Sequence, residues 1–149
     1  MFEIERDRTA VELDMFMAAS PETVWRALTE PDLMERWCAR PVGLRAQVGS
    51  TFILEIPSDP PGEVSCEVVT ADPARRFTHS YTDLRAARPM RWMVDFTLVP
   101  EGTGTRVLLV FSGFDIDDRQ QAFARNAVER GWSRTLFPRL GAVVADLAG

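Results

Sequence analysis

The stretch RQQAFARNAVERGWSRTLFPRLGAVVADLA, residues 119–148, decides the fold of this chain. Apolar side chains recur in it at every fourth position, which predicts one long amphipathic helix with a single buried face. These side chains are Val128, Trp132, Leu136, Leu140 and Val144. Pro138 lies inside the pattern, and because an interior proline removes a helical hydrogen bond, we expect a kink over residues 134–138.

Most of the chain before this helix is typical of β-strands. Runs rich in β-branched and aromatic residues alternate with turns that contain proline and glycine, and such short turns favour antiparallel pairing. The predicted strands are residues 9–17, 51–56, 63–71, 77–82, 90–99 and 105–112. The sequence therefore predicts a curved antiparallel sheet of about six strands.

Two short helices are predicted after the first strand. Ser20 followed by Pro21 is typical of a helix start, and an apolar stripe continues the helix over residues 21–29. The pattern restarts at Pro31 and ends near Trp37. Strands, two short helices and one long terminal helix together indicate an α+β fold, in which the sheet packs against the long helix.

Length and composition agree with one globular domain. The chain has 149 residues, of which 46% are hydrophobic, so we expect a single domain over residues 1–149 with a frayed start over residues 1–8. The net charge of -5 argues against a nucleic-acid partner. No apolar run approaches the ~18 residues of a membrane span. Two cysteines without redox spacing, and no signal peptide, predict a cytoplasmic location.

Several kinds of chemistry are excluded by composition alone. All 17 basic residues are arginines, which rules out a Schiff-base lysine and a P-loop lysine. His79 is the single histidine, so a metal site with two histidines is also ruled out. No pair of carboxylates is predicted to converge on one cavity. We therefore predict no catalytic residue, no metal and no cofactor, and leave open whether the chain is an enzyme.

The predicted inner face of the sheet is apolar and aromatic. A twisted sheet around one helix tends to leave space at one end, and ligand pockets of this kind measure roughly 300–1,000 Å³. We expect such a cavity between sheet and helix, with a small apolar or aromatic molecule as its ligand. The candidate ligand-binding residues are Trp37, Phe52, Cys66, His79, Tyr81, Trp92, Phe96, Phe111, Trp132 and Leu136.

Three of these candidates carry a polar group. His79 has two possible roles. It could anchor a ligand or act as an acid–base group, with Tyr81 on the same strand face, or it could be a core histidine that is hydrogen-bonded to a neighbour. The sequence favours the core role. Cys66 is expected to be a small buried hydrophobic residue, and Cys38 a partly exposed thiol in a loop. Neither thiol has a base beside it in sequence, so neither is predicted to be a nucleophile.

Residues 18–31, AASPETVWRALTEP, resemble the entry signature of the START-like superfamily, also called SRPBCC or Bet v 1-like. The most similar branch is the one named for the C-terminal domain of the activator of Hsp90 ATPase. Its later landmarks are matched in order by VGSTF at 48–52, PARRF at 73–77, PEGTGTR at 100–106, SGF at 112–114 and GW at 131–132. The resemblance implies a helix-grip fold with a cavity that holds hydrophobic molecules in relatives.

Three functions stay open at this point. The first is a domain that binds or sequesters a small hydrophobic ligand, the second a cyclase- or hydrolase-type enzyme with the same pocket, and the third an Hsp90-type co-chaperone. A homodimer is a separate prediction, because Leu108 and Val110 are apolar on the expected outer face. The alternative is that the N-terminal segment, with Phe2 and Ile4, covers that face.

Overall fold

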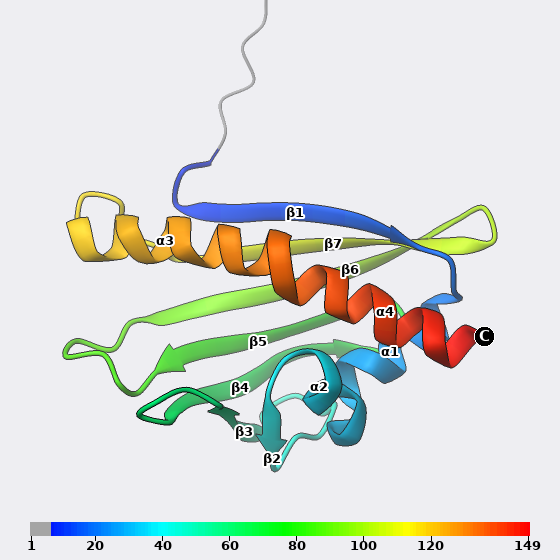
Figure 1. Ribbon diagram of the computed structural model, residues 1–149, viewed down its shortest axis with the longest axis horizontal. Helices are drawn as coiled ribbons and strands as arrows, with labels where there is room; N and C mark the ends of the chain where they lie inside the picture. The colour runs from blue at the N-terminus through cyan, green and yellow to red at the C-terminus, as the bar shows by residue number, and fades with distance from the viewer. Residues whose placement is uncertain (1–6) are drawn as a thin grey trace, which may run out of the picture.

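One curved antiparallel sheet, two short helices and a long C-terminal helix make up residues 7–149, the part of the chain that the computed structural model describes (Figure 1). The strand order is β1-β7-β6-β5-β4-β3-β2. The strands are β1 (Ala10–Met17), β2 (Arg40–Val42), β3 (Thr51–Ile56), β4 (Gly62–Asp72), β5 (Arg76–Asp83), β6 (Arg91–Glu101) and β7 (Gly104–Ser112). The predicted α+β helix-grip fold is confirmed. Most of the start that is predicted to fray, residues 1–6, lies outside the described residues.

The sheet has seven strands, where the sequence predicts about six. The additional strand is β2, which has only three residues and pairs with β3, so that Pro41 lies opposite Leu54. A strand this short, centred on a proline, carries no alternation that a sequence pattern could reveal. Its position at the sheet edge is where a proline, which lacks an N–H, is tolerated.

Two short helices follow β1, as predicted: α1 (Pro21–Thr29) and α2 (Pro31–Trp37). The Ser20 hydroxyl accepts a hydrogen bond of 3.3 Å from the Thr23 N–H and caps α1. The indole Nε1 of Trp37 donates to the Ala27 carbonyl at 2.8 Å. This bond ties the end of α2 to α1 and fixes the direction of the Trp37 ring.

The long helix is continuous but changes its winding halfway along. It consists of α3 (Arg119–Gly131), the π-helical turn η1 (Trp132–Leu136) and α4 (Phe137–Ala148). The N–H of Phe137 bonds the carbonyl of Trp132, five residues earlier. Pro138 has no N–H to offer the preceding turn, and the π-helical turn lies directly before it. A π-helical turn therefore lies where the sequence predicts a proline kink.

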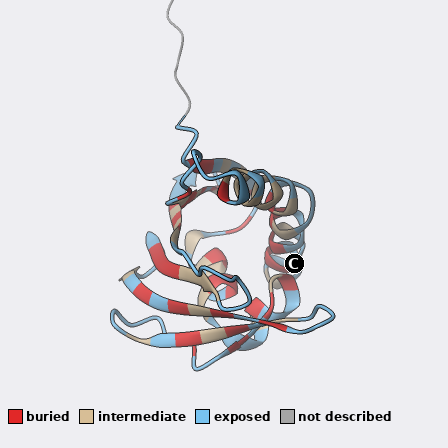
Figure 2. Ribbon diagram, turned by 90° about the vertical axis from the view of Figure 1, so that its left-hand side faces the viewer, coloured by how far each residue is buried: buried red, intermediate tan, exposed pale blue. Residues whose placement is uncertain are grey.

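The sheet curves around one side of the helix, and Figure 2 shows this arrangement from one end. The predicted inner-face residues Val11, Val64, Phe77, Val107 and Leu109 are fully buried. Strand β5 departs from the predicted alternation, because Thr78 and Ser80 on its other face are buried as well. In α4, Phe137, Leu140, Val143 and Val144 are buried. In α3, by contrast, Gln121 is the one buried residue. The C-terminal half of the helix therefore anchors the core, and the N-terminal half packs loosely.

No helix in residues 7–149 has both the length and the apolar content needed to cross a membrane.

Candidate ligand-binding site

Three aromatic rings meet where the helix crosses the sheet. The rings of Trp37 and Trp132 have centroids 5.8 Å apart, and Phe96 lies 6.3 Å from Trp37 and 5.8 Å from Trp132. These separations are those of direct edge-to-face packing between aromatic side chains. The three rings come from α2, β6 and η1, so this cluster joins the short helices, the sheet and the long helix.

Only a small space remains beside this cluster. Its volume is about 20 Å³, little more than one water molecule needs. We call this space the inner chamber; it is lined by Met34, Trp37, Cys38, Leu54, His79, Tyr81, Val94, Phe96 and Trp132. The open cavity expected from the sequence is thus closed at this position, because the predicted lining rings pack against one another.

Five of the ten predicted site residues line the inner chamber: Trp37, His79, Tyr81, Phe96 and Trp132. The others lie elsewhere. The Phe52 ring contacts His79 at 5.3 Å, and Cys66 is buried in the core. Trp92 and Phe111 belong to a neighbouring aromatic group, and Leu136 is half-buried in η1.

Four lining residues are missing from the predicted set: Met34, Cys38, Leu54 and Val94. The inward alternation of the strands places Leu54 and Val94 on the inner face, so that signal was present. Met34 lies in α2 and Cys38 directly after it, and no pattern in the seven residues of α2 can determine how this helix is oriented. Cys38, which the sequence places in a partly exposed loop, is half-buried at the end of α2.

His79 is a neutral hydrogen-bond acceptor in the inner chamber. Its Nδ1 lies 2.8 Å from the Ser80 carbonyl, which only accepts, so Nδ1 carries the proton and Nε2 is left with a lone pair. Burial lowers the pKa of His79 to about 4, and the bond to Ser80 opposes this only in part. The predicted core role of His79, with a bond to a neighbour, agrees with this geometry.

This burial predicts a pH-dependent stability. An unfolded histidine has a pKa near 6.5. As the pH falls below that value, His79 therefore becomes protonated in the unfolded state but stays neutral in the folded state. The free energy of unfolding should therefore fall from about pH 6.5 to about pH 4, where folded His79 itself titrates. Between pH 7.5 and pH 5 we expect His79 to account for a loss of about 2 kcal/mol.

Urea denaturation at several pH values measures this effect, and His79→Gln is the matched variant. Both proteins share their carboxylates, so the difference between their two pH profiles reports His79 alone. The variant should lose less stability than the original chain between pH 7.5 and pH 5. Parallel profiles would show that His79 has the same pKa in the folded and the unfolded chain, so that burial does not lower it.

The other polar groups in and near the inner chamber are also uncharged. Burial raises the pKa of the Cys38 thiol to about 12. The pKa of the Cys66 thiol is also raised to about 12, by burial and by the nearby Cys38. Burial likewise raises the pKa of the Tyr81 hydroxyl above its usual range. Neither thiol is therefore a nucleophile at neutral pH, as predicted. The chamber offers weak donors and one acceptor, but no charge.

A second aromatic group adjoins the inner chamber through Tyr81. The Tyr81 ring stacks on Trp92 at 6.3 Å, and Trp92 packs on Phe114 at 4.7 Å. The indole Nε1 of Trp92 is buried and has no hydrogen-bond partner among the described residues. A buried donor left without a partner costs about 1–3 kcal/mol, so it calls for an acceptor that residues 7–149 do not supply.

Residues 7–149 contain no group of three His, Cys, Asp or Glu side chains arranged to hold a metal ion.

Comparison with known proteins agrees with the geometry. The profile of the family described as "Activator of Hsp90 ATPase homolog 1-like protein" matches residues 18–145. The chain belongs to this family. The match covers strands β2 to β7, both short helices and nearly all of the long helix, so the resemblance inferred from the sequence motifs is confirmed. No curated protein matches the chain.

Solved structures share the same fold. Protein MLL2253 of Mesorhizobium loti is 29% identical, with a TM-score of 0.81 over 92% of this chain and 97% of that one. DynU16, described as a protein in the dynemicin biosynthetic locus, is 17% identical, with a TM-score of 0.77 over 92% of this chain and 47% of its own. The Aha1 dimer of Colwellia psychrerythraea is 20% identical, with a TM-score of 0.70 over 93% and 96%.

Proposed function

We propose that this chain binds a small, uncharged aromatic or apolar molecule between the sheet and the C-terminal helix. The observation that carries the proposal is the buried, unpartnered Nε1 of Trp92 inside an aromatic group. A ligand oxygen would satisfy this donor, and the Nε2 lone pair of His79 would accept from a ligand hydroxyl. The occurrence of a structural neighbour, DynU16, in a biosynthetic locus agrees with a small-molecule ligand.

The ligand is expected to be neutral because the site has no charge to offer. Burial keeps His79, Tyr81, Cys38 and Cys66 uncharged at neutral pH. An ionised ligand would lose its hydration without gaining an opposite charge, which is costly in an apolar interior. A planar molecule with one hydroxyl or carbonyl group fits these requirements best.

Binding requires a side chain to move, because the inner chamber holds only about 20 Å³. Trp132 is the best placed to do so. Its ring closes the chamber, and it begins η1, a π-helical turn of a kind that is frequent at functional sites. The adjoining helix α3 buries little of its own surface, so the ligand is expected to enter beside α3.

Thermal melting with three naphthalene probes tests the proposal. 1-Naphthol offers an oxygen and a proton, naphthalene offers only the ring, and 1-naphthoate carries a charge. At 100 times its Kd, 1-naphthol should stabilise the fold by about 2.7 kcal/mol, which raises Tm by about 5–10 °C in a chain of this length. Naphthalene should stabilise it less and 1-naphthoate not at all.

Trp92→Phe is the matched control, because it keeps the aromatic ring and removes the N–H. In this variant the difference in Tm increase between 1-naphthol and naphthalene should become smaller. The proposal fails if none of the probes raises Tm, or if 1-naphthoate stabilises the fold as well as 1-naphthol does.

The remaining predictions concern partners. Enzymatic and co-chaperone activities stay alternatives, since family membership alone fixes neither. A homodimer stays a prediction as well; a dimer is described for the Colwellia psychrerythraea neighbour. On this chain Leu108 is 36% exposed and Val110 half-buried, as a dimer through the outer face would need. Phe2 and Ile4, the alternative cover, lie outside the described residues.

A further inference from the structure

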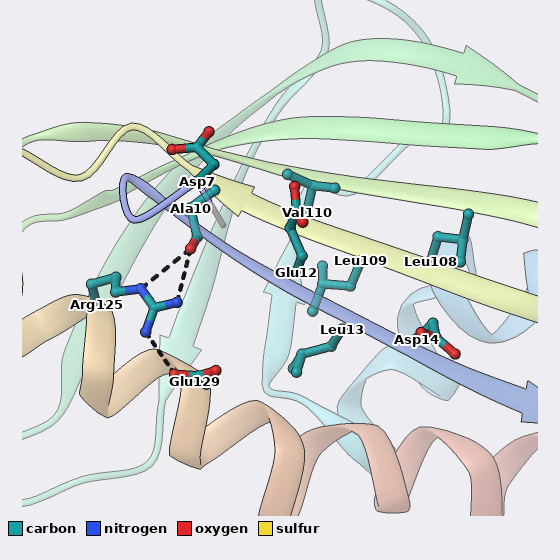
Figure 3. A pocket seen from close by; sticks show the side chains of 10 residues that line it. All are labelled: Asp7, Ala10, Glu12, Leu13, Asp14, Leu108, Leu109, Val110, Arg125 and Glu129. Carbon is teal, nitrogen blue, oxygen red and sulfur yellow. Dashed lines mark hydrogen bonds and ion pairs between the residues drawn. The ribbon is translucent and has the colours of Figure 1, made fainter. Parts of the chain in front are cut away.

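An open groove runs between the free edge of β1 and helix α3, away from the inner chamber (Figure 3). Its volume is about 560 Å³, within the range of ligand-binding pockets. We call it the edge groove; it is lined by Asp7, Ala10, Glu12, Leu13, Asp14, Leu108, Leu109, Val110, Arg125 and Glu129. None of these residues has a role in the proposed ligand site.

The backbone of β1 presents unpaired groups to this groove. Within residues 7–149, β1 ends the sheet and pairs with β7 on one side only. The N–H of Ala10 bonds Asp7, and its carbonyl accepts from Arg125 at 3.1 and 3.2 Å, so Ala10 faces the free edge. Because successive residues of a strand direct their backbone groups to opposite edges, those of Glu12 and Asp14 face it too.

Arg125 closes one end of this edge and leaves the rest available. Its guanidinium binds the Ala10 carbonyl and pairs with Glu129 on the next helical turn at 2.6 Å (Figure 3). Beyond it, the backbone groups of Glu12 and Asp14 have no neighbouring strand in the part of the chain that the structure describes. An unpaired strand edge of this kind is a template for another extended segment.

The negative charge of the edge groove determines which kind of extended segment it can bind. Four carboxylates (Asp7, Glu12, Asp14 and Glu129) and one arginine line it. Two of the carboxylates already have a partner, since Asp14 pairs with Arg106 of β7 at 2.9 Å and Glu129 pairs with Arg125 at 2.6 Å, but the carboxylates still outnumber the arginines. A second copy of β1, paired antiparallel, would place Glu12 and Asp14 opposite carboxylates, which is unfavourable. A segment with Lys or Arg at alternate positions would instead place cations opposite both side chains.

We propose that the edge groove binds an extended segment of another protein, with Lys or Arg at every second position, as an additional strand beside β1. The basic side chains lie over Glu12 and Asp14 on the outer face of the sheet. The intervening side chains point toward Leu13 and α3, where small apolar residues fit. The proposal does not depend on the ligand site, which lies on the inner side of the sheet.

The test uses the whole chain and the peptide acetyl-Arg-Val-Arg-Val-Arg-Val-amide, with binding measured by fluorescence anisotropy and by amide NMR shifts. We expect shifts concentrated in β1 and the start of α3, and an affinity that falls as salt rises. Glu12→Gln with Asp14→Asn should weaken binding about fivefold. Glu63→Gln with Asp72→Asn on β4, which removes the same charge elsewhere, should change it little.

A backbone variant separates strand pairing from simple charge attraction. Glu12→Pro removes an N–H that faces the groove and spares the hydrogen bonds to β7. Proline is tolerated at such edge positions, so the variant should fold. Its affinity for the peptide should fall at least tenfold. If that variant does not fold, N-methylation of alternate peptide amides makes the same test on the intact protein. Three results would overturn the proposal. The two double variants could lose affinity equally, the NMR shifts could spread over the whole surface, or binding could stay undiminished after the backbone donors are removed.

Discussion

Replacing Trp132 with alanine is expected to lower the free energy of unfolding by about 3–5 kcal/mol. The side chain is 7% exposed, and its ring packs against Trp37 and Phe96 at 5.8 Å and against Phe137 at 6.0 Å. Removal of the indole leaves a void lined by these rings, which the sheet and helix can fill only in part. Urea denaturation followed by circular dichroism measures the loss.

The same variant should gain a binding site for indole. An engineered apolar cavity stays dry and takes up an aromatic molecule of matching size. Saturating indole should therefore restore part of the lost stability in Trp132→Ala and have less effect on the original chain. Trp25→Ala is the control: its ring packs on Phe77 at 5.8 Å, outside the chamber, so indole should not rescue it. A small loss without rescue would show that Trp132 does not close the space.

Replacing Gly104 with alanine should destabilise the chain by about 1–3 kcal/mol, although only a methyl group is added. A Cβ at this position would lie 2.5 Å from the Met17 carbonyl oxygen and 2.5 Å from the Phe16 ring. Gly104 begins β7, which is held between β1 and β6, so the backbone has little freedom to move away. Thermal melting monitored by circular dichroism reports the effect.

Gly131→Ala provides the matched control with the opposite sign. A Cβ there meets nothing within 4 Å, and the position is helical. Alanine should therefore stabilise the helix by about 0.5–1 kcal/mol. If both variants shift Tm in the same direction, the close approach at Gly104 is not what decides its effect.

The strands show why the fold was predictable from sequence. Alternation in residues 63–71 and 77–82 already separates Val64, Val68 and Phe77, all buried, from neighbours on the other face. The four-residue spacing from Val128 to Val144 likewise predicts the long helix. Both patterns are local, because side-chain direction repeats with the backbone period of each element.

For the candidate site, the sequence could predict only which side chains share the inner face of each strand. His79, Tyr81 and Phe96 follow from strand alternation, whereas Met34 and Cys38 depend on how α2 sits against the sheet. The burial that keeps His79 neutral comes from other elements, among them Phe52 of β3, whose ring lies 5.3 Å away. No local pattern encodes the distance between two elements.

The sequence by itself determined the class of fold, the buried face of each long element, the absence of lysine chemistry and the family resemblance. Tertiary structure alone decided that the rings of Trp37, Phe96 and Trp132 leave only about 20 Å³ in the inner chamber, and that a π-helical turn precedes Pro138 in the long helix. It also decided that, within residues 7–149, β1 has a free edge beside α3. The physical reason is that periodicity fixes the direction in which a side chain points, while the separation of packed elements depends on the curvature of the whole sheet.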